Sequence, residues 1–265
     1  MRNACWVKPG SAAGLAQRAT DDLLGLEKRE SDKRMEALTE RLSLLHNRLF
    51  AEHKRSVLLV LQGLDASGKD GTIRRVFTGL NPQGCQVESF REPTYLELDH
   101  DFLWRIHAAL PRRGDIGIFN RSHYEDVVTV QVLGLIDDAE RERRYEQINA
   151  FERMLHEEGT RVVKVFLHVG KKKQRERLQA RVDDPEKHWK FRTDDLDTRA
   201  HWDEYQRLYD AAITATSTKW APWFVVPADH KWVSGLTVAS ILAATLEEMD
   251  PHIPPGGDLD GVVVE

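Results

Sequence analysis

A short glycine-rich segment carries the residue types and spacing that bind phosphate. Residues 63–69 read GLDASGK and fit the first seven positions of the phosphate-binding loop, G-x-x-x-x-G-K. Gly63 and Gly68 let the backbone fold around an anion, so that successive N–H groups point at phosphate oxygens, and Lys69 adds a mobile positive charge. The alternative is a glycine-rich turn without a ligand, but the full spacing and the flanking elements favour a phosphate site. The residues expected to contact phosphate here are Gly63, Ala66, Ser67, Gly68, Lys69, Asp70 and Gly71.

Two carboxylates in or beside this loop indicate a divalent cation. Asp65 lies within the loop, and Asp70 stands where such loops normally carry a Ser or Thr whose hydroxyl binds magnesium. Two carboxylates would repel a chain of phosphates unless a cation lay between them. We therefore expect Asp65 to help recruit Mg²⁺, which takes oxygen ligands from carboxylate and phosphate together. For Asp70, this role and that of a helix-start carboxylate facing the helix dipole both stay open.

A second polar cluster follows the apolar run at residues 116–119. Arg121 could clamp phosphoryl oxygens and offset the charge that develops during transfer, while Glu125 and Asp126 could order metal-bound water or orient an acceptor. Asn120 occupies the strand-end position where many phosphate-loop proteins carry a metal-binding Asp. The alternative is a capped helix start with Glu125 in a capping box, and the two roles can coexist.

Residues 171–192 form a basic stretch, with nine Lys and Arg against four Asp and Glu, in a chain whose net charge is -5. A proline and two aromatic residues interrupt its helical pattern, which indicates an excursion over the site. An Arg-rich flap of this kind would close over phosphate, exclude water and add positive charge. The three-lysine run at 171–173 is typical of a solvated surface. Arg177 and Arg181, one helical turn apart, are the stronger functional candidates.

The elements that must position these residues alternate between strand and helix. Strands are expected at 57–61, 85–90, 115–120, 161–169 and 223–227, and helices at about 31–49, 68–80, 100–110, 124–134, 138–158, 171–182, 202–217 and 232–249. This rhythm predicts an α/β fold with three layers, in which a five-stranded parallel sheet has helices on both faces and ligands bind at the C-terminal strand ends. We expect a loosely held, flexible arm over 1–28, one phosphate-loop domain over 29–250 with a helical lid at about 171–203, and a tail over 251–265.

Composition narrows the class of protein. The acidic net charge argues against nucleic-acid binding, and two cysteines at positions 5 and 85 make neither a disulfide framework nor a paired metal motif. No apolar run approaches the length of a membrane span, and the N-terminus lacks the apolar core of a signal peptide. We therefore expect a cytoplasmic protein without a membrane partner.

The chain resembles the polyphosphate kinase 2 family over roughly residues 40–250. The shared motifs are GLDASGKDGT at 63–72, NPQGC at 81–85, FNRSHYEDV at 119–127, FERML at 151–155, DPEKHWKFR at 184–192 and TSTKWAPWFVVPADHKW at 216–232. The resemblance implies a thymidylate-kinase-like fold, Mg²⁺ as cofactor, and phosphoryl transfer between inorganic polyphosphate and nucleotides. It also makes a homo-oligomer plausible, as a dimer or tetramer.

The resemblance assigns roles residue by residue. Catalytic roles fall to Asp65, Lys69, Arg121 and Arg181, with Asp65 as the metal ligand; the lid adds Arg177, Lys187 and Arg192 as phosphate contacts; and the nucleotide would meet Asn120, Glu125, Asp126 and Trp189. Trp189 or Phe191 could stack on the base, or either could belong to the core. The acceptor phosphate is already ionised at neutral pH, so that no strong general base is required and His123 need not be catalytic.

The strand-end motif points to a subgroup. Family members that interconvert nucleoside di- and triphosphates tend to read FDRSWYN, whereas FNRSHYE is similar to the subgroup that accepts both mono- and diphosphates. We therefore expect reversible transfer from polyphosphate to AMP and ADP or similar nucleotides. Two alternatives remain: an ATP-dependent nucleoside monophosphate kinase, and a non-enzymatic nucleotide-binding switch.

Overall fold

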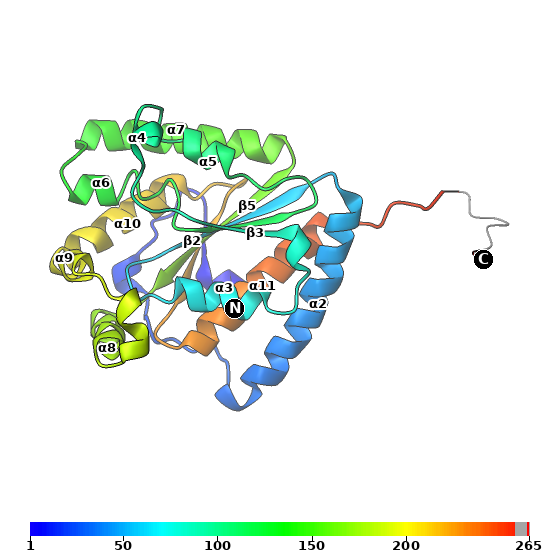
Figure 1. Ribbon diagram of the computed structural model, residues 1–265, viewed down its shortest axis with the longest axis horizontal. Coiled ribbons are helices and arrows are strands. Elements are labelled where there is room, and N and C mark those ends of the chain that lie inside the picture. The colour runs from blue at the N-terminus through cyan, green and yellow to red at the C-terminus, as the bar shows by residue number, and fades with distance from the viewer. Residues whose placement is uncertain (258–263, 265) are drawn as a thin grey trace.

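A computed structural model describes residues 1–257 and 264, with Asp195 described by its backbone alone. Its centre is a six-stranded sheet in the order β1-β6-β5-β2-β4-β3 (Figure 1). The strands are β1 (Trp6–Val7), β2 (Ser56–Gln62), β3 (Cys85–Ser89), β4 (Ile116–Asn120), β5 (Thr160–His168) and β6 (Trp223–Pro227). β2 to β6 pair in parallel and β1 pairs antiparallel with β6. The expected five parallel strands are thus confirmed, and β1 adds an unexpected sixth at the edge.

Helices cover both faces of the sheet, which confirms the three-layer α/β/α prediction. The helices are α1 (Arg2–Cys5), α2 (Ser31–Glu52), α3 (Lys69–Phe77), α4 (Tyr95–Leu98), α5 (Trp104–Ala108), α6 (Thr129–Val132), α7 (Asp138–Glu157), α8 (Lys171–Val182), α9 (Asp194–Ala200), α10 (Trp202–Thr216) and α11 (Lys231–Met249). Short 3₁₀ turns lie at Leu15–Gln17, Lys28–Glu30, Pro82–Gly84 and Pro185–Lys190. α2, α3 and α11 pack together on one face, while α7 and α10 lie on the other (Figure 1).

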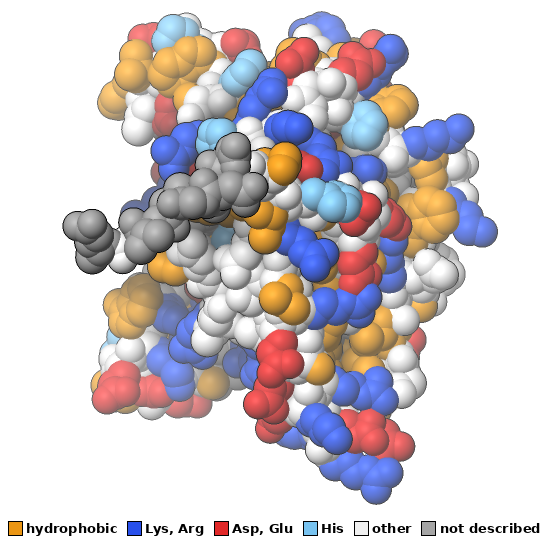
Figure 2. Space-filling model, turned by 90° about the vertical axis from the view of Figure 1, so that its right-hand side faces the viewer, with side chains coloured by type: hydrophobic (Ala, Val, Ile, Leu, Met, Phe, Trp, Pro, Cys, Tyr) orange, Lys and Arg blue, Asp and Glu red, His pale blue; other side chains and the backbone are white. Residues whose placement is uncertain are grey.

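The apolar pattern of each element matches its place in these layers. Every residue of β2 is buried, because this strand lies inside the sheet with helices on both sides. α11 is buried on most of its surface, since it packs on the sheet and is itself covered by α2 and α3. α2 buries only one stripe, which includes Leu42, Leu45 and Leu49. On the face that carries α2, basic and acidic side chains are interspersed (Figure 2).

The first 28 residues are packed against the domain, which differs from the loosely held arm expected from the sequence. Val7 in β1 and Leu15 are each at most 2 % exposed and belong to the main core. Leu15 N donates to Asp210 Oδ1 at 2.7 Å, and Thr20 Oγ1 donates to Asp229 Oδ2 at 2.9 Å. The apolar residues of this segment pack one at a time against elements that are distant in the sequence. The segment therefore shows no regular spacing of apolar residues. The predicted tail at 251–265 lies outside the described residues from position 258 on, except for Val264.

Candidate active site

The C-terminal ends of β2 and β4, the start of α3, and α8 surround one large cleft of about 1630 Å³. All the site residues predicted from the sequence line it. They are Gly63, Asp65, Ala66, Ser67, Gly68, Lys69, Asp70, Gly71, Asn120, Arg121, Glu125, Asp126, Arg177, Arg181, Lys187, Trp189 and Arg192. Parallel strands bring their carboxyl ends to one edge of the sheet, which explains why segments so far apart in the sequence meet there.

The glycine-rich loop joins β2 to α3 and folds back over its own lysine. Gly63 and Gly68 have φ of 146° and 109°, in a region that side chains rarely adopt. A Cβ on Gly63 would lie 2.8 Å from the Leu167 carbonyl oxygen, so that only glycine fits this close approach. Lys69 Nζ donates to the Gly63 carbonyl at 2.6 Å. Burial lowers the pKa of Lys69 to about 8, because the charged form loses its hydration.

Arg121 and Asp65 form an ion pair across the cleft floor. One Arg121 guanidinium nitrogen donates to Asp65 Oδ1 at 2.6 Å, and the Arg121 backbone has a left-handed φ of 64°. Burial alone would raise the pKa of the Asp65 carboxyl, but the Lys69 and Arg121 charges outweigh it and hold the pKa below its usual value. Burial likewise opposes the charge on Arg121, whose pKa is nevertheless raised by Glu125 and Asp65. Both groups are therefore charged in the ordinary pH range.

Asp70 and Asn120 form a second contact between the loop and the end of β4. Asn120 Nδ2 donates to Asp70 Oδ1 at 2.8 Å, and Asp70 is exposed at the start of α3. Among the residues that the structure describes, no group of three or more His, Cys, Asp or Glu side chains could hold a metal ion. Mg²⁺ commonly uses one or two carboxylates together with phosphate oxygens and water. Asp65 and Asp70, which both line the cleft, fit that smaller requirement.

Glu125 and Asp126, expected at the nucleotide, differ in their surroundings. Glu125 accepts from Thr129 Oγ1 at 2.5 Å and lies 4.0 Å from Arg121. Asp126 is nearly buried and accepts from Arg105 at 3.3 Å. Burial raises the pKa of Asp126 although Arg105 opposes this shift. Glu125 therefore lies beside Arg121, whereas the Asp126 carboxylate pairs with Arg105 on α5.

Arg177, on α8, supports the loop rather than pointing freely into the cleft. One of its guanidinium nitrogens donates to the Ala66 and Ser67 carbonyls at 2.9 and 2.8 Å. The other donates to the Ala228 and Asp229 carbonyls at 2.6 and 3.1 Å. Since both terminal nitrogens bind main-chain oxygens, Arg177 fixes the phosphate loop against the end of β6.

The other lid residues lie farther out along the cleft. Arg181 donates to the Lys190 carbonyl at 3.0 Å, which ties α8 to the following 3₁₀ turn. Lys187 pairs with Asp184, and Arg192 lies 3.0 Å from Asp194. Trp189 is 78 % exposed and lines the cleft, so it does not belong to the core.

Sequence reasoning missed several basic residues that line the same cleft. These are Arg74 and Arg75 on α3, Arg91 after β3, Arg105 on α5, Arg144 on α7 and Lys231 at the start of α11. In the sequence, the basic residues on helices cannot be distinguished from ordinary charged residues on a solvent-exposed helix face. Arg74 and Arg75 follow the loop lysine by less than two helical turns, and this proximity was the available signal.

Comparison with known proteins gives consistent matches. The family model described as Polyphosphate kinase 2 matches residues 25–254. An AMP/ADP-polyphosphate phosphotransferase of Meiothermus ruber is 47 % identical over 98 % of this chain and 98 % of its own length. An ADP-polyphosphate phosphotransferase of Rhodopseudomonas palustris is 46 % identical over 81 % of this chain and 78 % of its own. The crystal structure of polyphosphate kinase 2 from Arthrobacter aurescens superposes with a TM-score of 0.92 at 41 % identity, covering 96 % of this chain and 91 % of that one.

Proposed function

The chain belongs to the polyphosphate kinase 2 family, and we propose that it transfers phosphoryl groups reversibly from inorganic polyphosphate to AMP and ADP. The M. ruber relative that matches nearly the whole chain carries both acceptors in its name. The FNRSHYE motif at 119–125, which resembles the same subgroup, is consistent with this acceptor range.

The charge of the cleft is the observation that best supports polyphosphate as the phosphoryl donor. Among the residues that the structure describes, thirteen Lys and Arg line it, against eight Asp and Glu, in a chain whose net charge is -5. A long, uniformly charged polymer needs such a basic track, because it offers no distinct groups for a specific pocket to recognise. The basic residues extend from the phosphate loop to the lid.

The chemical step is in-line transfer. A terminal phosphate oxygen of the nucleotide attacks the terminal phosphorus of polyphosphate, the bond to the next bridging oxygen breaks, and the shortened polymer keeps that electron pair. Lys69 and Arg121 neutralise the transferring group, and the loop N–H groups hold it in line. The lid, with Arg181, Lys187 and Arg192, covers the site and limits transfer to water. Trp189, which is exposed in the cleft, would stack on the nucleobase.

Mg²⁺ fits this site as the cofactor. Asp65 would be its protein ligand, with Asp70 beside it, and the ion would supply charge neutralisation of the phosphoryl oxygens. Arg121 contacts Asp65 through Oδ1, so the carboxylate has a second oxygen, Oδ2, that would face a cation. Chelation should abolish turnover, and Asp65→Asn should raise the Mg²⁺ concentration required for half-maximal rate.

The proposal also covers the cellular compartment and the oligomeric state of the enzyme. Among the described residues, none of the helices is long and apolar enough to cross a membrane. Cys5 and Cys85 are free thiols, as is usual in a reducing compartment. We place the enzyme in the cytoplasm, with its nucleotide acceptors, and as a homo-oligomer.

Product analysis tests this function. Purified protein is incubated with Mg²⁺, long-chain polyphosphate and either AMP or ADP, without ATP, and the nucleotides are separated by ion exchange. ADP and ATP formed from AMP support the donor and the acceptor range. Product from ADP alone contradicts the acceptor range. Turnover that requires ATP as donor indicates a monophosphate kinase instead.

A further inference from the structure

Arg121 holds a backbone conformation that its surroundings must enforce. A φ of 64° is uncommon for a residue with a long side chain, and such conformations persist only where the structure around them holds them. Before Arg121, the sheet provides this restraint, since Arg121 N donates to the Leu61 carbonyl at 3.0 Å. The restraint after Arg121 must come from residues 122–124.

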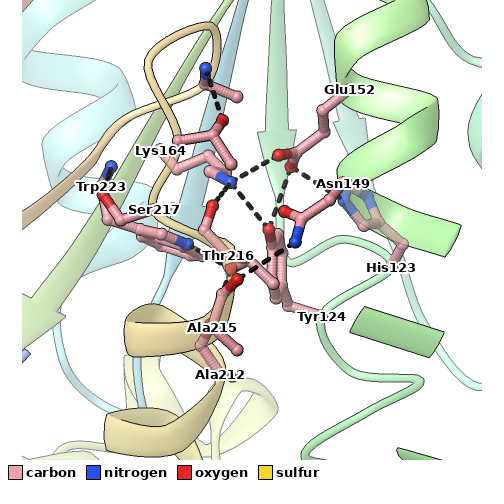
Figure 3. A network of polar contacts seen from close by, with 12 residues as sticks. His123, Tyr124, Asn149, Glu152, Lys164, Ala212, Ala215, Thr216, Ser217 and Trp223 are labelled. Carbon is pink, nitrogen blue, oxygen red and sulfur yellow. Dashed lines mark hydrogen bonds and ion pairs between the residues drawn. The ribbon is translucent and has the colours of Figure 1, made fainter. Parts of the chain in front are cut away.

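The side chains of His123 and Tyr124 lie in a buried polar network (Figure 3). Tyr124 OH donates to Glu152 Oε1 at 3.0 Å and accepts from Lys164 Nζ at 2.8 Å. His123 Nε2 lies 3.4 Å from the same Glu152 oxygen. All four side chains are at most 1 % exposed, and neither His123 nor Tyr124 lines the cleft.

Lys164 on β5 organises this network. Its ammonium donates to Glu152 on α7 at 2.5 Å and to the Thr216 carbonyl at the end of α10 at 2.7 Å, in addition to Tyr124. Its three donors are thus used by three partners from different elements. Burial lowers the pKa of Lys164 to about 8 although Glu152 opposes the shift. Because the desolvation cost of such a pair largely cancels its attraction, net stability is a weak explanation for it.

The network does fix the course of the backbone that follows Arg121. Tyr124 can satisfy Lys164 and Glu152 together only at one position, three residues after Arg121. The Tyr124 ring also packs edge-on against Trp223, with centroids 4.7 Å apart. The Tyr124 N–H donates to Ser122 Oγ at 3.2 Å, so that the intervening turn is closed as well.

We propose that Tyr124 is a positioning residue: its hydroxyl, held by Lys164 and Glu152, keeps Arg121 in the left-handed conformation that aims its guanidinium at the transferring phosphoryl group. This inference rests on the proposed function for its kinetic consequence, but its geometric consequence can be measured without turnover. Tyr124 itself does not touch the substrate.

The test is Tyr124→Phe, which keeps the ring contact with Trp223 and removes only the hydroxyl. The expected crystal structure has Arg121 displaced from its 2.6 Å contact with Asp65. The expected kinetics are a fall of about tenfold or more in kcat with little change in the KM for AMP, since small misplacements of a catalytic group are costly. In an Arg121→Lys background, Tyr124→Phe should have little further effect, because it acts through Arg121.

Tyr145→Phe is the matched control. Tyr145 is also a buried tyrosine, on α7, but its hydroxyl finds no hydrogen-bond partner within the described part of the chain and lies outside the network. If Tyr124→Phe does not fold, the triple change Tyr124→Phe, Glu152→Leu, Lys164→Met replaces it, since it removes the buried charges together. Unchanged Arg121 geometry in the folded variant, or equal kinetic losses with and without Arg121→Lys, overturns the inference. A wild-type protein inactive with polyphosphate contradicts the proposed function, and the crystal structures still decide the positioning role.

Discussion

The guanidinium of Arg121 lies 2.6 Å from the carboxylate of Asp65, which joins the end of β4 to the middle of the phosphate loop. In the proposed mechanism, Arg121 is the cation that clamps the phosphoryl group and Asp65 is the ligand of Mg²⁺. In the free protein these two groups neutralise each other. Because each charge compensates the other, both side chains stay ionised in the absence of substrate. When substrate and Mg²⁺ bind, the phosphoryl group would pair with Arg121 and the metal ion would bind Asp65, in place of the contact between the two side chains.

Arg121→Lys tests the clamp. Lysine keeps the positive charge but loses the planar fork that contacts two oxygens at once. We expect kcat to fall by about 10²-fold, as for the loss of one oxyanion donor, with little loss of stability because the side chain is partly exposed. Steady-state kinetics and urea unfolding measure the two effects. A variant with wild-type kcat would show that Arg121 does not act on the transferring group.

The pH dependence follows from the pKa of Lys69, which burial lowers to about 8. Lys69 is protonated below that pH and loses its charge above it, so that kcat/KM, which reports the free enzyme, should fall about tenfold per pH unit above about 8. Bound phosphates favour the ammonium, so kcat should fall only at higher pH. In Lys69→Arg the decline should disappear. A wild-type kcat/KM that stays constant to about pH 9.5 would contradict the role of Lys69.

Arg177 and Arg181 lie one turn apart on α8 but should respond differently to substitution. Arg177→Ala removes the hydrogen bonds to the phosphate loop and the end of β6, and should lower the free energy of unfolding by about 3 kcal/mol. Arg181→Ala should change it by less than about 0.5 kcal/mol and raise the KM for polyphosphate. Denaturant unfolding and KM measurements separate the two. Equal stability losses would mean that Arg181 is also structural.

Most residues of the candidate site could be predicted from local patterns in the sequence. The phosphate loop and the cluster at 119–126 could be predicted because each follows an apolar strand directly and the fold brings strand ends together. The place of Arg177 in the cleft could be predicted, but its hydrogen bonds could not, since their partners include carbonyls at Ala228 and Asp229, far along the chain. The packing of the first 28 residues was missed for a similar reason: β1 spans only two residues, too few to show alternation.

Salt should weaken polyphosphate binding more than nucleotide binding. Many Lys and Arg contacts release counterions from a polyanion, so the KM for polyphosphate should rise steeply between about 50 and 300 mM salt. The KM for AMP should change much less. Lys187→Ala, on the lid, should make the slope for polyphosphate shallower. Equal slopes for the two substrates would contradict a basic track for the donor.

The most direct test of the central claim compares wild-type protein with Lys69→Ala for product formation from AMP and polyphosphate in Mg²⁺. We expect ADP and ATP from the wild type and none from the variant, whose circular dichroism and unfolding transition should show an intact fold. A folded Lys69→Ala protein that turns over at the wild-type rate would contradict phosphoryl transfer at the phosphate loop.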